Sequence, residues 1–183
     1  MAYPGKEIVN PVIGQQIRFL KTADETCGQL LEMEATYRSR SREPKPHYHP
    51  QQEEYFMVMD GQLNVRLNGT VRKLRRGDRL LIPRNTVHSM WNEQDEKAVV
   101  IWQVRPALQT EYMLETAAGL ASDGKTDGAG MPTLLQRVLL ARRFTSVFRL
   151  ASPSFLWQRI LFALLAPVSY LAGYRPVYRQ YLD

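Results

Sequence analysis

All three histidines of this 183-residue chain stand at spacings that suit a metal site. His47 and His49 are separated by one residue, Glu54 follows shortly after them, and His88 comes later in the chain. Residues i and i+2 of a β-strand point to the same face, so the first two imidazoles can be directed at one point. Imidazole nitrogens and a carboxylate oxygen bind divalent transition metals and leave coordination positions open. These residue types therefore predict a metal centre with room for a substrate.

The segment that begins at His47 resembles the first of two sequence motifs of the cupin superfamily. Four residues separate His49 from Glu54 and six separate Glu54 from Gly61, as in the family motif. The glycine that opens the family motif is replaced here by Ser41. The histidines and the acidic residue nevertheless stand in the register of the family.

A second segment resembles the other cupin motif. Its positions are occupied by Gly77, Pro83, His88 and Asn92, while Asn85 stands where the family has an inner glycine. Asparagine is among the residues that most readily adopt a positive φ, so this replacement is compatible with the turn. Two coupled motifs that hold every histidine of the chain make the resemblance specific.

The resemblance covers roughly residues 40–95 and is closest to the small single-domain bacterial cupins with an RmlC-like fold. It implies a mainly β protein built as an antiparallel jelly-roll barrel, the double-stranded β-helix. It also implies that His47, His49, Glu54 and His88 bind one divalent transition metal. Iron, manganese, nickel, copper and zinc are not distinguished by the sequence.

Glu53 is the rival of Glu54 for the carboxylate position. Alternation along the strand predicted at residues 53–59 places Glu54, but not Glu53, on the face that carries Phe56 and Val58. We expect that face to line the barrel interior. Further side chains are expected to contact a bound ligand or to line the cavity, with turn capping or core packing as the alternative for several of them: Gln52, Tyr48, Phe56, Met90, Asn92 and Trp102.

Short alternating segments separated by turn residues predict the strands of the barrel. Asn68-Gly69 is a strong signal for a type I′ hairpin turn, and Gly77-Asp78 marks another turn. The predicted strands are residues 16–21, 28–38, 53–59, 62–67, 70–74, 79–82, 86–92 and 98–105.

After Pro106 the predicted strands give way to predicted helices and a linker. We expect a jelly-roll domain at residues 1–118 that includes a short helix at Leu108–Leu120, and a linker rich in Gly, Asp and Ser at residues 119–132. A C-terminal α-helical hairpin is predicted at residues 133–183, with helices at 133–150 and 154–173. This extension is expected to be dispensable for the metal site.

The positive charge of the chain is concentrated in that extension. Residues 1–130 hold equal numbers of basic and acidic residues, whereas residues 131–183 hold seven arginines and one aspartate. The uninterrupted apolar run at 160–166 is too short to span a bilayer, which requires about 20 residues.

Two alternatives stay open for the position of the C-terminal hairpin. The hairpin packs on the jelly roll or on a second subunit, as in a homodimer, or it lies on an anionic membrane surface. No helix-turn-helix spacing supports nucleic-acid binding.

The composition indicates a globular protein, because 44% of the residues are hydrophobic and 23% are charged. Cys27 is the only cysteine, and the polar N-terminal segment at 1–14 has no signal-peptide pattern, so we expect a cytoplasmic protein.

Three functions are compatible with the predicted site. The leading expectation is a metal-dependent enzyme that acts on a small organic molecule, as the resemblance to cupin dioxygenases with phenolic or enolic substrates implies. The second is a Lewis-acid isomerase or cyclase. The third is a non-catalytic cupin that binds a small molecule or uses the metal only for stability. The same barrel serves many chemistries, so the fold does not decide among them.

Overall fold

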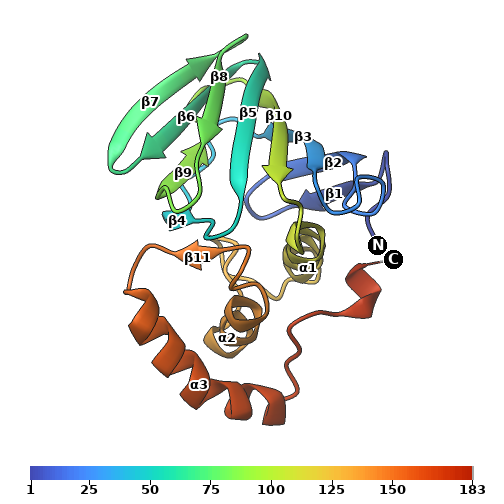
Figure 1. Cartoon of the computed structure of the whole chain (residues 1–183), viewed down its shortest axis with the longest axis vertical. Coiled ribbons are helices and arrows are strands. Elements are labelled where there is room, and N and C mark those ends of the chain that lie inside the picture. Colours follow the sequence, from blue (N-terminus) through green and yellow to red (C-terminus); the bar gives the residue numbers. More distant parts are fainter. Residues whose placement is uncertain (183) are drawn as a thin grey trace.

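Two antiparallel sheets form the jelly roll in the computed structural model, which describes residues 1–182 (Figure 1). Asp183, the last residue of the predicted extension, lies outside the described residues. The first sheet contains, in spatial order, β1 (Glu7–Asn10), β2 (Gln15–Lys21), β3 (Leu31–Tyr37), β10 (Ala98–Arg105), β5 (Glu53–Asp60) and β8 (Arg79–Ile82). The second contains β11 (Arg149–Leu150), β4 (His47–Tyr48), β9 (His88–Trp91), β6 (Gln62–Leu67) and β7 (Thr70–Arg75).

The central strands show why the sequence forms this sandwich. Every second residue of β3 and β10 is apolar and fully buried, and the intervening residues are more exposed. In the register of the pair, Val100 lies opposite Ala35 and Trp102 lies opposite Met33. The apolar side chains of both strands thus lie on the inward face of the first sheet and share one core with Leu63 and Val65 of the second sheet.

Tight turns fix the register of the strands that carry the site. Asn68 and Gly69 have φ angles of 46° and 90° and connect β6 to β7, as a type I′ turn requires. Gly61 has a φ of 72°, and a Cβ atom there would collide with the carbonyl oxygen of Lys97. Asn85 has a φ of 62°, which confirms that asparagine replaces the family glycine at a left-handed position.

The helices are gathered at one end of the barrel (Figure 1). They are α1 (Thr110–Ser122), α2 (Leu134–Arg143), α3 (Phe155–Leu171) and the 3₁₀ helix η1 (Arg179–Tyr181). The hairpin of α2 and α3 has its own small core, in which Val138 and Leu139 meet Ala166. Within residues 1–182, none of these helices combines the length and the apolarity that a bilayer crossing needs.

The structure corrects several predicted boundaries. The helix expected at 133–150 ends at Arg143, and after a turn the chain continues as β11. The helix expected at 154–173 is present as α3, with Pro167 inside it. The two-residue strands β4 and β11 are too short to show alternation, and the four-residue strand β1 was also missed.

Candidate metal centre

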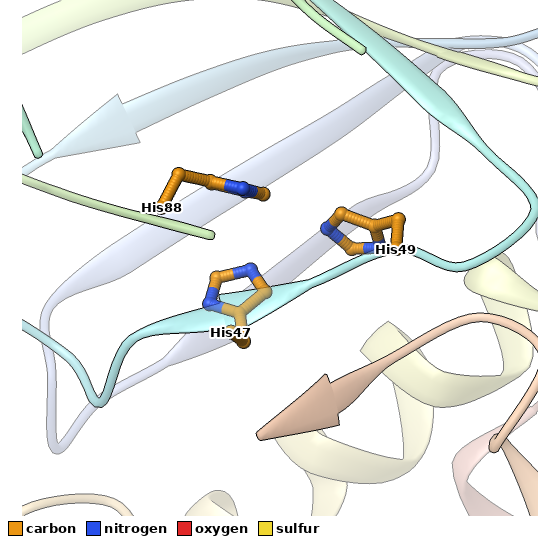
Figure 2. A group of neighbouring side chains, drawn as sticks. All are labelled: His47, His49 and His88. Carbon is orange, nitrogen blue, oxygen red and sulfur yellow. The ribbon is translucent and has the colours of Figure 1, made fainter. Parts of the chain in front are cut away.

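The three histidines converge between β4, β9 and the loop that follows β4 (Figure 2). His47 and His88 are directly paired residues of the two strands, and their ring centroids are 4.4 Å apart. His49 lies one residue beyond β4, and its ring centroid is 5.1 Å from that of His47. Each imidazole offers a ligand nitrogen, and all three nitrogens lie within 4.8 Å of one another. The i, i+2 spacing and the cross-strand pair therefore produce one cluster.

Backbone carbonyls orient all three imidazoles. In each ring, Nδ1 faces a carbonyl oxygen, which can only accept a hydrogen bond, so Nδ1 carries the proton and Nε2 keeps its lone pair. The distances are 2.6 Å from His49 to Val147, 3.0 Å from His88 to Thr86 and 3.4 Å from His47 to Lys45. This pattern fixes the tautomer that a metal-binding histidine needs.

Glu54 completes the cluster from β5 of the opposite sheet. Its side chain is buried, and Oε2 lies 2.9 Å from Nε2 of His88 and 3.3 Å from Nε2 of His49. Within the described chain, Oε2 of Glu54 and Nε2 of His49 are buried without a hydrogen-bond partner. Lone pairs that face each other at this distance repel unless a cation lies between them. The donor set, three imidazole nitrogens and one carboxylate oxygen, fits a divalent transition metal.

The electrostatic environment keeps most of the cluster in its metal-binding protonation state. Burial, aided by the imidazoles of His88 and His49, lowers the pKa of His47 to about 3, so this ring is neutral. Burial alone would raise the pKa of Glu54, but His49 and His88 outweigh it and hold the pKa well below its usual range. Burial lowers the pKa of His49, but the charge of Glu54 outweighs it and raises the pKa, so a proton and a cation compete for this ring.

Glu53 occupies the outer face of β5. It lines a shallow surface groove together with Tyr55 and Leu81, whereas Glu54 is buried in the barrel interior. Among the described residues, the three histidines thus have Glu54, and not Glu53, as their carboxylate neighbour. The geometry agrees with the choice made from alternation.

Trp102 contacts the cluster through Glu54. Its indole Nε1 donates a hydrogen bond of 2.9 Å to Oε1 of Glu54, which leaves Oε2 directed at the histidines. Phe56 stacks on Trp102 with ring centroids 5.7 Å apart, and Met90 is buried in the same core. Of these predicted cavity residues, Trp102 positions a candidate ligand, while Phe56 and Met90 fill the barrel.

The side chains of Gln52 and Asn92 stabilise turns through hydrogen bonds to backbone carbonyls. The side-chain amide of Gln52 donates to the carbonyl oxygen of Pro106 at 2.8 Å, in the turn before α1. The side-chain amide of Asn92 donates to the carbonyl oxygen of Glu96 at 2.6 Å. The backbone N–H of Asn92 donates to Oγ of Ser41 at 2.8 Å, so the serine that replaces the family glycine joins the two motifs.

Sequence reasoning missed the contribution of the C-terminal extension. Strand β11 pairs with β4, where Arg149 lies opposite the predicted cavity residue Tyr48. The ring of Phe148 stacks on His47 with centroids 4.6 Å apart and planes 26° apart. Residues 147–150 thus contact two of the three histidines, while the expectation that the site forms without the extension stays a prediction. No sequence pattern predicts the contact with His49, because the atom that makes it is a backbone carbonyl oxygen, which every residue has.

A cavity of about 300 Å³ adjoins the cluster between β4, β11 and the helices. His47 and Phe148 line it on the barrel side, and apolar residues of the three helices form most of its wall. Lys45, Arg137 and Arg149 also line it, and the described lining contains no acidic residue. Nε of Arg137 is buried without a hydrogen-bond partner among residues 1–182. The cavity is therefore apolar and cationic.

Comparison with known proteins agrees with the fold and the motifs. Residues 33–104 match the family model described as "Cupin domain". Polyketide synthase CurC of Streptomyces cyaneus is 38% identical over 60 residues, which are 33% of this chain and 39% of that protein. Tetracenomycin polyketide synthase protein TcmJ of Streptomyces glaucescens is 35% identical over 60 residues, 33% of this chain and 40% of that protein. The chain thus matches about two fifths of the length of these relatives.

A solved structure with the same fold is a predicted oxalate decarboxylase from Thermotoga maritima. It superposes with a TM-score of 0.50 at 15% identity, covering 55% of this chain and 90% of that one. This likeness concerns the fold alone. The domain match, with which the two sequence motifs and the jelly roll agree, identifies residues 33–104 as a cupin domain.

Proposed function

We propose that the protein is a metal-dependent enzyme that acts on a small, anionic organic molecule. The observation that carries the proposal is the buried Oε2 of Glu54, which faces the Nε2 atoms of His49 and His88 without a hydrogen-bond partner in the described chain. His47, His49, Glu54 and His88 would hold the ion. When bound, a divalent transition metal polarises a carbonyl, enol or phenol oxygen of the substrate.

The cavity beside His47 supports the substrate class. Its volume of about 300 Å³ lies at the lower end of the size range of small-molecule sites. Apolar walls favour a hydrocarbon or aromatic body, and a lining with cations but no described carboxylate favours a carboxylate, phenolate or enolate group. Arg137 is the best placed partner for that group, because its Nε has no hydrogen-bond partner among the described residues.

Three groups around the cluster would support a bound ion. Phe148 shields one face of His47 from water, which strengthens electrostatic interactions inside the site. Trp102 holds Glu54 in place through Oε1. The carbonyl of Val147 keeps the proton of His49 on Nδ1. Each of these contacts fixes a candidate ligand before a substrate arrives.

The relatives favour Lewis-acid chemistry among the reaction types left open by the sequence. Two of them are named as polyketide synthase proteins, and polyketides are rich in enolisable carbonyl and phenol groups. Isomerisation or ring closure of such a substrate needs a polarised oxygen and a dry cavity. Oxygenase chemistry on a phenol or enol is the second candidate, since three imidazoles and a carboxylate leave positions for dioxygen on a six-coordinate ion.

The test combines metal analysis with turnover. The full chain is dialysed, its metal content is measured by mass spectrometry, and it is incubated with a panel of β-diketones, hydroxyarenes and aryl carboxylates. Substrate loss is followed by chromatography and oxygen uptake by an electrode. Loss of substrate without oxygen uptake supports isomerase or cyclase chemistry, and loss of substrate with stoichiometric oxygen uptake supports an oxygenase.

The matched variants are Glu54→Gln, which should abolish turnover, and Glu53→Gln, which should not. Stoichiometric metal without turnover of any compound leaves the non-catalytic function and contradicts the proposal.

A further inference from the structure

Helix α3 buries two polar side chains and exposes many apolar ones. The polar residues Gln158 and Ser169 are 4% and 0% exposed and face the protein. The amide of Gln158 donates to the carbonyl of Leu150 at 2.9 Å, and the hydroxyl of Ser169 donates to the carbonyl of Leu165 at 2.9 Å. The inward face also carries Phe162, Leu165 and Ala166, so α3 is apolar on both sides, whereas a helix that meets water has a polar outer face. The outer face of α3 is therefore adapted to a different environment.

That outer face is continuous and strongly apolar. Seven large side chains share it and are between 41% and 89% exposed: Leu156, Trp157, Ile160, Leu161, Leu164, Val168 and Leu171. Their spacing of three, four and seven residues places them on one side of the helix. Figure 1 shows α3 at the end of the molecule opposite β7 and β8, and the exposure of these side chains shows that the barrel does not cover this face. A contiguous apolar patch of this kind marks a surface for a membrane or a partner.

Basic side chains border the same face. Arg142 of α2 and Arg159 of α3 line a groove of about 530 Å³ between the helices, and Leu156 and Ile160 line it too. Residues 131–183 hold seven arginines and one acidic residue, and none of these arginines forms an ion pair within residues 1–182. The extension thus presents apolar surface together with uncompensated positive charge.

We propose that α3 docks on the surface of an anionic lipid bilayer. The apolar face enters the boundary between headgroups and acyl chains, and Arg142 and Arg159 bind lipid phosphates from the groove beside it. Amphipathic helices with a broad apolar face and flanking cations bind membranes in this way. A second copy of the chain fits the face less well, because it would bring another strongly positive extension against the first. Charge complementarity therefore selects an anionic bilayer.

Tryptophan emission provides a direct test with the full chain. Trp157 is 66% exposed, whereas Trp91 and Trp102 are 4% and 9% exposed, so a blue shift on addition of vesicles reports Trp157. We expect the shift with vesicles of phosphatidylcholine and phosphatidylglycerol, a much weaker one with phosphatidylcholine alone, and reversal by salt. Trp157→Phe should abolish the shift without preventing co-sedimentation.

Matched variants separate the apolar and the charged contributions. Leu164→Ser combined with Leu171→Ser should abolish sedimentation with anionic vesicles, while Leu81→Ser on the exposed outer side of β8 should not. Arg142→Gln and Arg159→Gln should each weaken binding roughly 5-fold, and Arg72→Gln on β7 should leave it unchanged. Equal binding to neutral and anionic vesicles would overturn the proposal. So would a lipid-free, concentration-dependent dimer in which Trp157 is already shielded, since that result would assign the face to a second copy.

Discussion

The carbonyl oxygen of Val147 lies 2.6 Å from Nδ1 of His49, although 98 positions separate the two residues in the chain. Through this contact the C-terminal extension fixes the orientation of a histidine that belongs to the first cupin motif. Partners that orient metal-binding histidines strongly influence metal affinity. The candidate centre is consequently a product of the barrel and the extension together.

Replacing Glu54 by Gln should remove the anionic ligand from the cluster and sharply reduce the metal content of the purified protein. A metal present at a hundredfold excess over its dissociation constant stabilises the native state by about 2.7 kcal/mol, and this increment should disappear. Thermal denaturation with and without a chelator measures it. Glu53→Gln, on the outer face of the same strand, is the control. If Glu53→Gln loses the metal and Glu54→Gln retains it, the assignment of the carboxylate is wrong.

Replacing Trp102 by Phe should weaken metal binding by about 10- to 100-fold, because Oε1 of Glu54 loses its donor. The matched control is Trp91→Phe. Trp91 is also buried, but its Nε1 donates to Glu93 and not to a residue of the cluster. Titration of the metal-free variants with a divalent cation gives the two affinities. Equal affinities would show that the hydrogen bond to Glu54 does not matter for the centre.

Replacing Phe148 by Ala should lower the free energy of unfolding by about 1–3 kcal/mol, less than for a fully buried phenylalanine. It should also raise the rate at which a chelator removes the metal, because His47 loses the ring that covers it. Chelator-dependent metal release followed with a colorimetric indicator measures this rate. Arg143→Gln, at the exposed end of α2, should leave the rate unchanged. An unchanged rate for Phe148→Ala would mean that the metal leaves by another route.

Replacing Arg137 by Gln should weaken the binding of aryl carboxylates or phenolates by roughly 10-fold, because the cavity loses a cation whose Nε has no hydrogen-bond partner in the described chain. Isothermal calorimetry on the metal-loaded protein gives the affinities. A neutral aromatic of the same shape should bind both proteins equally. Equal loss for the neutral and the anionic compound would indicate a collapsed cavity instead of a lost charge.

Glu43 gives a pH-dependent prediction. Hydrogen bonds from Arg66, with Nε at 2.7 Å and Nη2 at 2.9 Å, hold the pKa of Glu43 below its usual range despite partial burial. A carboxyl whose pKa is lowered in the folded state stabilises the fold above its unfolded pKa of about 4.3, and this contribution is lost as the pH falls through the folded pKa. Wild type should therefore be more stable than Glu43→Gln near neutrality, and the difference should vanish in acid. A difference that persists in acid would contradict this assignment.

The strands could be predicted because their signals are local, and the resemblance to cupins then implied the jelly roll. Eight strands were identified from alternation, and Asn68-Gly69 indicated the hairpin turn from two residues. The choice of Glu54 over Glu53 followed from the period of two along β5. Asn85 fell at the left-handed position that the second motif requires. In each case a few neighbouring residues were enough to make the prediction.

The remaining features depend on contacts between distant segments. The helix predicted at 133–150 was too long, because pairing of β11 with β4 outweighs the local helical pattern. A carbonyl such as that of Val147 is present in every residue, so its contact with His49 leaves no sequence signal. The exposed apolar face of α3 was equally hidden, because a helix that is apolar on both sides does not reveal in its sequence which side meets the protein.

The pairing of β11 with β4 also sets an order of events during translation. All four candidate ligands emerge from the ribosome, followed by β10, before residues 147–150 have been synthesised. N-terminal segments fold first during synthesis, so for a time the nascent barrel holds its ligands while Phe148 does not yet cover His47. An ion can enter from that side in this interval. For an ion that binds in this interval, the supply of cations in the cell would count beside equilibrium affinity.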